Sequence, residues 1–148
     1  MYYHMTQILD EKTCKPTMFE PKVGYRFLVQ ITNGKDNVLI PSFVICKIDR
    51  PSFSYTTFGF KKYDILKLSM YDPIVPSTML AVTNAIDRKA KWDINIRILG
   101  PVGDVVEEWG ISNAKLVYVK PSSMSWQEDG DPALVDIGFK ISEVVHYY

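Results

Sequence analysis

Side chains suited to acid–base, nucleophilic or metal chemistry are few in this sequence, and they match no known catalytic pattern. The two histidines, His4 and His146, lie near opposite ends of the chain. A histidine that acts as a base or ligand needs convergent partners, and neither one has a recognisable partner motif. The paired histidines of a zincin helix, the GxSxG of serine hydrolases and a glycine-rich phosphate loop are all absent from the sequence. We therefore predict no catalytic residue and a protein that is not an enzyme.

The two cysteines, Cys14 and Cys46, are far apart in the sequence. Their spacing matches neither a CxxC redox pair nor a zinc knuckle. We interpret them as free thiols of a protein made in a reducing cytoplasm, with one long-range disulfide as the alternative.

An acidic stretch, residues 127–131, has the composition of a calcium-binding loop but not its spacing. Placing Gly130 at loop position six puts Ser125 first and Asp136 twelfth, where the motif needs Asp and a bidentate Glu. The Asp-Gly and Asp-Pro pairs in this stretch form turns by themselves. We therefore predict a solvated turn, no metal site and no cofactor.

Aromatic side chains are abundant, with three Trp, nine Tyr and seven Phe. A nucleic-acid stacking platform combines such side chains with a positive groove, but basic and acidic residues number 17 each, and the formal net charge is zero. This balance disfavours tight DNA binding. We interpret the aromatic residues as core and subunit contacts, and the neutral charge as favouring self-association.

Length and composition predict one globular domain. A chain of 148 residues that is 47% apolar and 23% charged can bury its own core. The longest uncharged apolar stretch, residues 73–86, is shorter than the roughly 20 residues that cross a bilayer, and the first residues lack the apolar run of a secretory signal. We predict no membrane span, an extended N-terminal arm at residues 1–20 and a β domain at residues 21–148.

Most of the predicted domain alternates apolar and polar residues with the period of a half-buried strand. The clearest case is residues 92–98, in which Trp92 and three isoleucines alternate with polar residues. The segments that we predict as strands are residues 25–32, 38–40, 43–48, 52–58, 61–70, 92–98, 105–109, 114–119 and 134–145. Ser77 caps one predicted helix at residues 78–89. Short strands separated by turn signals, with one helix, predict a mainly β fold: an antiparallel β-sandwich or small barrel with one flanking α-helix.

Five short motifs in a fixed order resemble the tail tube proteins of contractile-tailed bacteriophages, which share their fold with the tubes of contractile injection systems. The motifs are Pro21-Lys22 before Arg26-Phe27, Ile48 to Phe53, Tyr71 to Ser77, Leu99 to Asp104, and Ser125-Trp126 through Asp131-Pro132. Each motif alone is an ordinary turn or strand edge. The resemblance covers nearly everything after residue 20.

The resemblance implies a structural virion protein that assembles into stacked hexameric rings. These rings would form the inner tail tube, through whose lumen double-stranded DNA passes without specific binding. The implied partners are further copies of the chain and the tail sheath, tape-measure and baseplate proteins. The implied location is the virion tail, after synthesis in the host cytoplasm.

The segment Ser52 to Met70 is a candidate for contacts between subunits. Under the resemblance it is a hairpin that reaches over a neighbouring ring, and the arm at residues 1–20 adds further contacts. The residues that we predict to make inter-subunit contacts are Ser52, Phe53, Tyr55, Phe58, Phe60 and Tyr63.

Three other functions stay open at this point. The first is a baseplate tube initiator or an injection-system tube protein of the same fold. The second is a monomeric β-sandwich that binds carbohydrate or protein, which predicts a stable monomer with a concave aromatic patch. The third, an enzyme, requires a reactive cluster that the sequence does not supply.

Overall fold

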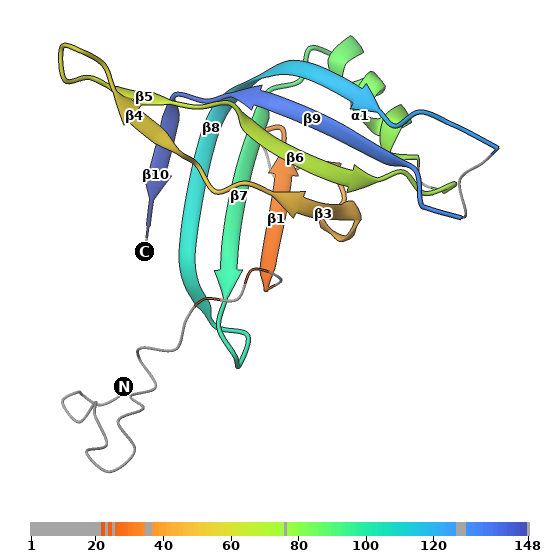
Figure 1. Ribbon diagram of the computed structural model, residues 1–148, viewed down its shortest axis with the longest axis horizontal. Coiled ribbons are helices and arrows are strands. Elements are labelled where there is room, and N and C mark those ends of the chain that lie inside the picture. Colours follow the sequence, from red (N-terminus) through yellow and green to blue (C-terminus); the bar gives the residue numbers. More distant parts are fainter. Residues whose placement is uncertain are drawn as a thin grey trace.

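The computed structural model describes residues 22, 24, 26–34, 37–75, 77–126 and 130–147. Over these residues the chain is mainly antiparallel β with one α-helix (Figure 1), so the predicted fold class is confirmed. The predicted arm, residues 1–20, lies outside the described residues, and the predicted division at residue 21 stays a prediction. Among the described residues, no helix is both long enough and apolar enough to cross a membrane.

Seven strands follow one another across a strongly curved sheet in the order β2-β1-β7-β8-β9-β6-β3. β10 is the eighth strand of this sheet and pairs with β8. The strands are β1 (Phe27–Thr32), β2 (Val38–Ile40), β3 (Ile45–Ile48), β4 (Phe53–Tyr55), β5 (Lys61–Tyr63), β6 (Leu66–Tyr71), β7 (Trp92–Leu99), β8 (Val105–Pro121), β9 (Leu134–Lys140) and β10 (Glu143–His146). β4 and β5 form a separate two-stranded hairpin. A 3-10 helix, η2 (Ser42–Val44), precedes β3, and α1 (Thr78–Asp87) connects β6 to β7.

β8 organises the fold because its 17 residues run through both halves of the curved sheet. Its first part pairs with β7 and its last part, from Lys115, pairs with β9. Asn113, with a φ of 53°, lies just before this change of partner. The prediction of two strands separated at Gly110 is wrong, because Gly110 pairs with Asn95 inside the ladder.

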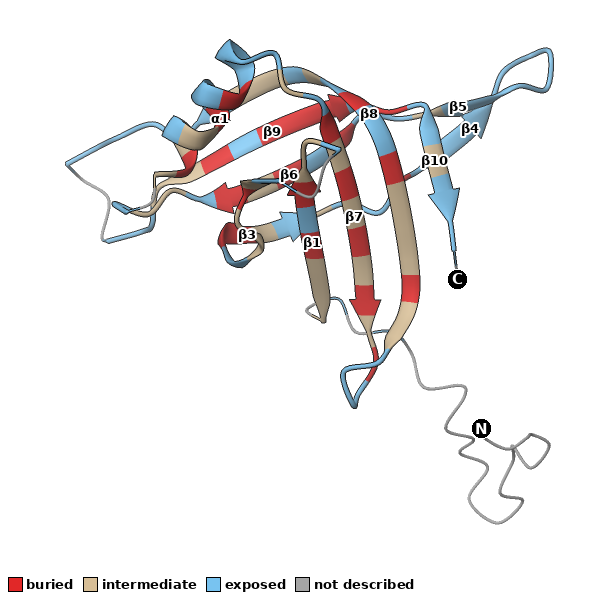
Figure 2. Cartoon of the chain, turned by 180° about the vertical axis from the view of Figure 1, so that it is seen from behind, coloured by how far each residue is buried: buried red, intermediate tan, exposed pale blue. Residues whose placement is uncertain are grey.

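The core lies between the two halves of this bent sheet. Alternate residues of β7 and β9 are buried (Figure 2), including the predicted inward residues Trp92, Ile94 and Ile96. Trp92 packs against Phe139 with ring centroids 5.3 Å apart. Each fully buried side chain of this size contributes about 1.5–3 kcal/mol, so the alternation fixes which face of each strand points inward.

Ser77 caps α1 as predicted, and its Oγ accepts a hydrogen bond from the Leu80 amide at 3.2 Å. Oδ1 of Asp72 accepts from the amides of Thr78 and Met79, at 3.0 and 3.2 Å. These bonds satisfy amides that a helix start leaves without partners. The helix ends at Asp87, two residues earlier than predicted.

Several predicted strands are shorter or divided in the structure. Of residues 52–58, only Phe53–Tyr55 form a strand, before the turn at Gly59. Residues 61–70 form two strands, because Asp64 turns back to Ser52: its amide donates to the Ser52 carbonyl at 2.9 Å. Residues 43–48 begin with η2, which follows Pro41. Residues 134–145 divide at Ile141, whose side chain enters the core while the chain crosses to pair β10 with β8.

Candidate functional site: a projecting hairpin and the pocket at its base

The β4–β5 hairpin projects from one end of the molecule, away from the main sheet (Figure 1). Its strands pair in register, with Phe53 opposite Tyr63 and Tyr55 opposite Lys61. The turn is closed by the Thr56 amide, which donates to the Phe60 carbonyl at 2.7 Å. Gly59 supplies the positive φ of 84° that this turn requires.

One face of the hairpin is aromatic. The Phe53 ring lies edge-on to Tyr55 and Tyr63, with centroids 6.2 and 5.7 Å away. Lys61 Nζ lies 4.3 Å from the Phe53 centroid, within cation–π distance. Edge-on aromatic pairs and cation–π contacts each contribute about 0.5–1.5 kcal/mol, so these side chains order the hairpin without a core of its own.

The aromatic side chains of the hairpin are largely exposed in the single chain. Phe58, in the turn, is 86% exposed, and Phe60 and Tyr55 are also exposed. A two-stranded hairpin is marginally stable in water, and a cluster of exposed large apolar side chains marks an interaction surface. The hairpin is therefore a candidate surface for binding another protein.

The structure places all the predicted inter-subunit residues on this hairpin or at its base. Five belong to the strands and turn: Phe53, Tyr55, Phe58, Phe60 and Tyr63. The sixth, Ser52, lies at the base, where its Oγ donates to Oδ2 of Asp64 at 2.9 Å. Their contact with a second subunit stays a prediction.

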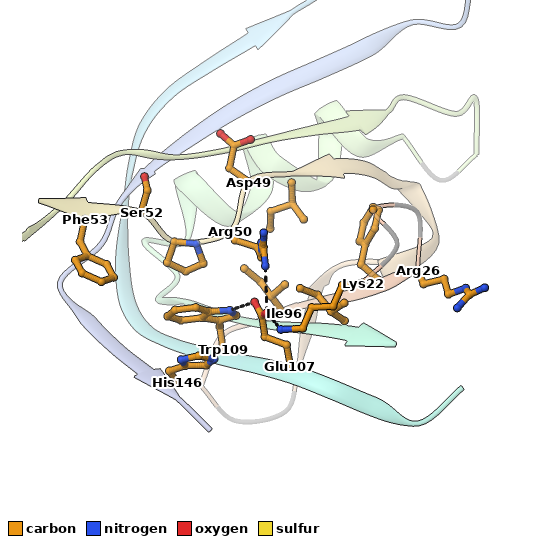
Figure 3. A pocket seen from close by; sticks show the side chains of 15 residues that line it. Lys22, Arg26, Asp49, Arg50, Ser52, Phe53, Ile96, Glu107, Trp109 and His146 are labelled. Carbon is orange, nitrogen blue, oxygen red and sulfur yellow. Dashed lines mark hydrogen bonds and ion pairs between the residues drawn. The ribbon is translucent and has the colours of Figure 1, made fainter. Parts of the chain in front are cut away.

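A pocket of about 740 Å³ lies at the base of the hairpin (Figure 3). Its walls come from the segment at Arg50 to Phe53 and from β1, β7, β8 and β10. The Glu107 side chain lies inside it, and this residue is only 3% exposed. Its Oε1 accepts hydrogen bonds from Lys22 Nζ and from Arg50 Nη1, the latter at 3.1 Å, and its Oε2 accepts from Trp109 Nε1 at 2.5 Å.

The environment of Glu107 determines its protonation state. Burial by itself raises the pKa of the carboxyl group, but the hydrogen bonds from Lys22 and Trp109 and the charges of Lys22 and Arg50 lower it more. The pKa of Glu107 therefore lies below its ordinary value, and the side chain is ionised at neutral pH. A carboxylate with both oxygens engaged by donors suits a structural anchor better than an acid or base.

Glu107 is the important residue that our sequence reasoning missed. It lies on the inward face of β8, the same face as Trp109 and the buried Ile111. A charged residue in an otherwise apolar inward series is a signal of a buried ion pair. The alternation therefore contained the information needed to find it.

His146 belongs to the same pocket, where its ring stacks on Trp109 with centroids 3.9 Å apart and planes 1° apart. This contact attaches β10 to β8.

The other candidate residues from the sequence are His4, the two cysteines and the acidic turn. His4 and Cys14 lie outside the described residues, as do residues 127–129 of the predicted acidic turn. Cys46 is a free thiol that donates to the Ser69 carbonyl at 3.3 Å. Across the described part of the chain, no group of three or more His, Cys, Asp or Glu residues is arranged to hold a metal ion.

Solved structures with the same fold include chains of a prophage baseplate and of a contractile injection system. A chain of the anti-feeding prophage baseplate aligns with a TM-score of 0.68 at 14% identity, covering 86% of this chain and 95% of that one. A chain of the sheath–tube complex of PVC, an extracellular contractile injection system, aligns with a TM-score of 0.63 at 19% identity, covering 98% of both chains. Hcp1 from E. coli EAEC 042 aligns with a TM-score of 0.63 at 9% identity, covering 83% and 91%. No protein-family model and no curated protein matches the sequence. The resemblance to tube proteins of contractile systems is thus confirmed at the level of the fold.

Proposed function

We propose that this protein is a structural tube subunit, whose copies close into hexameric rings that stack as the inner tube of a contractile particle. A shared fold does not by itself specify a function. The observation that carries the proposal is the ordered, exposed aromatic hairpin, which extends beyond the core on a fold found in contractile particles. Such a surface is buried once a neighbouring subunit covers it.

The margins of the sheet support assembly in a limited way. β2, β3 and β10 each lie at a sheet margin and are no longer than four residues. Short margins discourage unspecific pairing between chains. Specific association therefore has to come mainly from side-chain surfaces such as the hairpin, which agrees with a subunit that assembles only in one geometry.

In the bacteriophage version of the proposal, the tube delivers double-stranded DNA. The formal net charge of zero supports passage without specific binding, because phosphate binding needs a local excess of basic residues. The proposed partners are the tail sheath, tape-measure and baseplate proteins. The proposed location is the virion tail, after synthesis in the host cytoplasm.

A tube or baseplate protein of an injection system is the second candidate. It is favoured by the origin of two aligned structures, an extracellular contractile injection system and the anti-feeding prophage baseplate. Nucleic acid inside purified particles would distinguish the bacteriophage version. A monomeric ligand-binding sandwich is less well supported, because the exposed aromatic cluster projects from the surface on a hairpin.

Negative-stain electron microscopy of concentrated protein tests the proposal. We expect rings or hollow tubes of uniform diameter, and sedimentation velocity should show a mass that rises with concentration. Because a template can be required for assembly, the experiment is repeated with the baseplate complex of the particle that contains this protein. A monomer at all concentrations, with and without that complex, contradicts the proposed function.

A further inference from the structure

A second exposed apolar surface lies on two loops, and we call it the loop patch. Ile74 and Val75 lie between β6 and α1, and Met124 and Trp126 follow β8. Ile74 is 96% exposed, and the other three side chains are also almost fully exposed. A monomer rarely exposes so many large apolar side chains together unless a partner covers them.

The roots of these two loops are joined. The Asp72 amide donates to the Ala133 carbonyl at 3.0 Å, which ties the start of one loop to the end of the other. The Ser122 amide donates to the Leu134 carbonyl at 2.8 Å, and the Leu134 amide donates to Ser122 Oγ at 3.1 Å. The structure therefore presents the two loops from one framework.

The loop patch and the hairpin lie at opposite ends of the molecule. In Figure 1 the hairpin extends to the left and both loops lie on the right, and Figure 2 shows the same separation from behind. Because of this separation, the two apolar surfaces cannot cover each other within one subunit. Each needs a cover from outside the chain.

The charges around the two surfaces are complementary. Residues 53–63 of the hairpin include Lys61 and Lys62 and no acidic residue. The second loop carries the exposed Asp131, and none of the residues described between 122 and 133 is basic. Opposite charges around two apolar surfaces favour their association and disfavour pairing of either surface with itself.

We infer that the loop patch of one copy receives the hairpin of the next copy. This inference rests on the proposed function and identifies the surface that the hairpin binds. Because two different surfaces meet, the contact is head to tail, and its repetition produces a closed ring or an extended stack. Phe58 and Phe60, in and beside the hairpin turn, are the side chains that the loop patch buries.

Complementation between two defective variants tests the inference. One variant carries Phe58→Ser and Phe60→Ser, and the other carries Ile74→Ser and Val75→Ser. These side chains are exposed, so circular dichroism and thermal unfolding should be unchanged in both variants. Val102→Ser, at the exposed turn between β7 and β8, is the matched control and should assemble like the unmodified protein.

Each variant alone should stop at a smaller assembly than the unmodified protein in sedimentation velocity. In an equal mixture, the intact hairpin of the loop-patch variant can bind the intact loop patch of the hairpin variant, and the resulting pair has no intact surface left. The mixture should therefore form a species of twice that mass and nothing larger. The inference is overturned if the loop-patch variant assembles normally or if the mixture shows no association. In either case, tubes formed by the unmodified protein would still support the proposed function. Failure of the unmodified protein to assemble overturns both.

Discussion

Arg50, at the root of the hairpin, donates a hydrogen bond from Nη1 to Oε1 of Glu107 in β8 at 3.1 Å. Lys22 donates to the same oxygen, so one buried carboxylate joins the hairpin root, the N-terminal segment and the main sheet. An ionised group away from water is tolerated only when its partners are in place. The direction in which the hairpin leaves the sheet is therefore tied to Glu107.

Replacing this carboxylate should destabilise the fold. Glu107→Ala leaves the Trp109 indole without its acceptor and removes the partner of Arg50 and Lys22. These two cations are about half exposed and regain water, so we expect a loss of about 1–3 kcal/mol, below the cost of breaking a fully buried pair. Urea denaturation measures this change.

Glu108→Ala is the matched control, because this neighbouring carboxylate is more exposed than Glu107 and is held by Arg97 at 3.4 Å and by Asn95 at 2.9 Å. Its loss should stay below about 1 kcal/mol. Equal losses from the two variants would show that the buried cluster has no special role in stability.

The low pKa of Glu107 predicts a pH dependence of known sign. The pKa lies below the ordinary value of 4.5, mainly because the hydrogen bonds and charges of its partners outweigh the burial that raises it. The folded state therefore binds this proton more weakly than the unfolded chain. The stabilisation is complete above the unfolded pKa and is lost as the pH falls through the folded pKa.

The measurement is the difference in unfolding free energy between the unmodified protein and Glu107→Gln across a pH series. This difference should be constant near neutrality and should shrink as the pH falls below about 4.5. A difference that stays constant down to pH values where the protein unfolds would contradict the assigned ionisation.

Gly138 in β9 is predicted to tolerate no side chain. It lies opposite Tyr118 of β8, and a Cβ at this position would overlap the Tyr118 ring. Gly138→Ala must displace that ring, so we expect destabilisation of about 1–3 kcal/mol. Gly24→Ala is the control, because a Cβ there meets no atom within 4 Å. Thermal unfolding of the two variants should separate them, and equal melting temperatures would contradict this packing.

The alternation of apolar and polar residues predicts the inward faces of β1, β7 and β9, because a strand with one buried face needs an apolar residue at every second position. Gly110 shows where that reasoning stops. A glycine in a strand marks either a bend or the close approach of another group. Here the Tyr147 side chain, distant in sequence, lies 2.9 Å from where a Cβ of Gly110 would be, and the strand continues through it.

Pairing between distant segments is the other feature that the sequence does not reveal. β10 was predicted as the end of one long strand, but it pairs with β8 instead, with Val145 opposite Gly110. Both arrangements give the same alternation, so only the tertiary structure distinguishes them. Aromatic and hydroxyl side chains before Gly59 indicate extended chain that ends at a bend. The hairpin itself was expected only from the resemblance to tube proteins, and the contacts of its residues with a second subunit stay a prediction.

Removal of residues 1–18 tests the proposed role of the N-terminal arm in assembly. This deletion keeps Lys22, and with it the ion pair to Glu107, so the free energy of unfolding should stay within about 0.5 kcal/mol of the unmodified value. If the arm adds contacts between subunits, electron microscopy should show shorter tubes or a lower yield at equal protein concentration. Lys22→Ala in the full chain should instead lower the free energy of unfolding and leave tube length and yield unchanged, because it weakens the Glu107 cluster while the arm stays in place. Unchanged tube length and yield after the deletion would remove the arm from the assembly mechanism and leave the hairpin and the loop patch as its candidate surfaces.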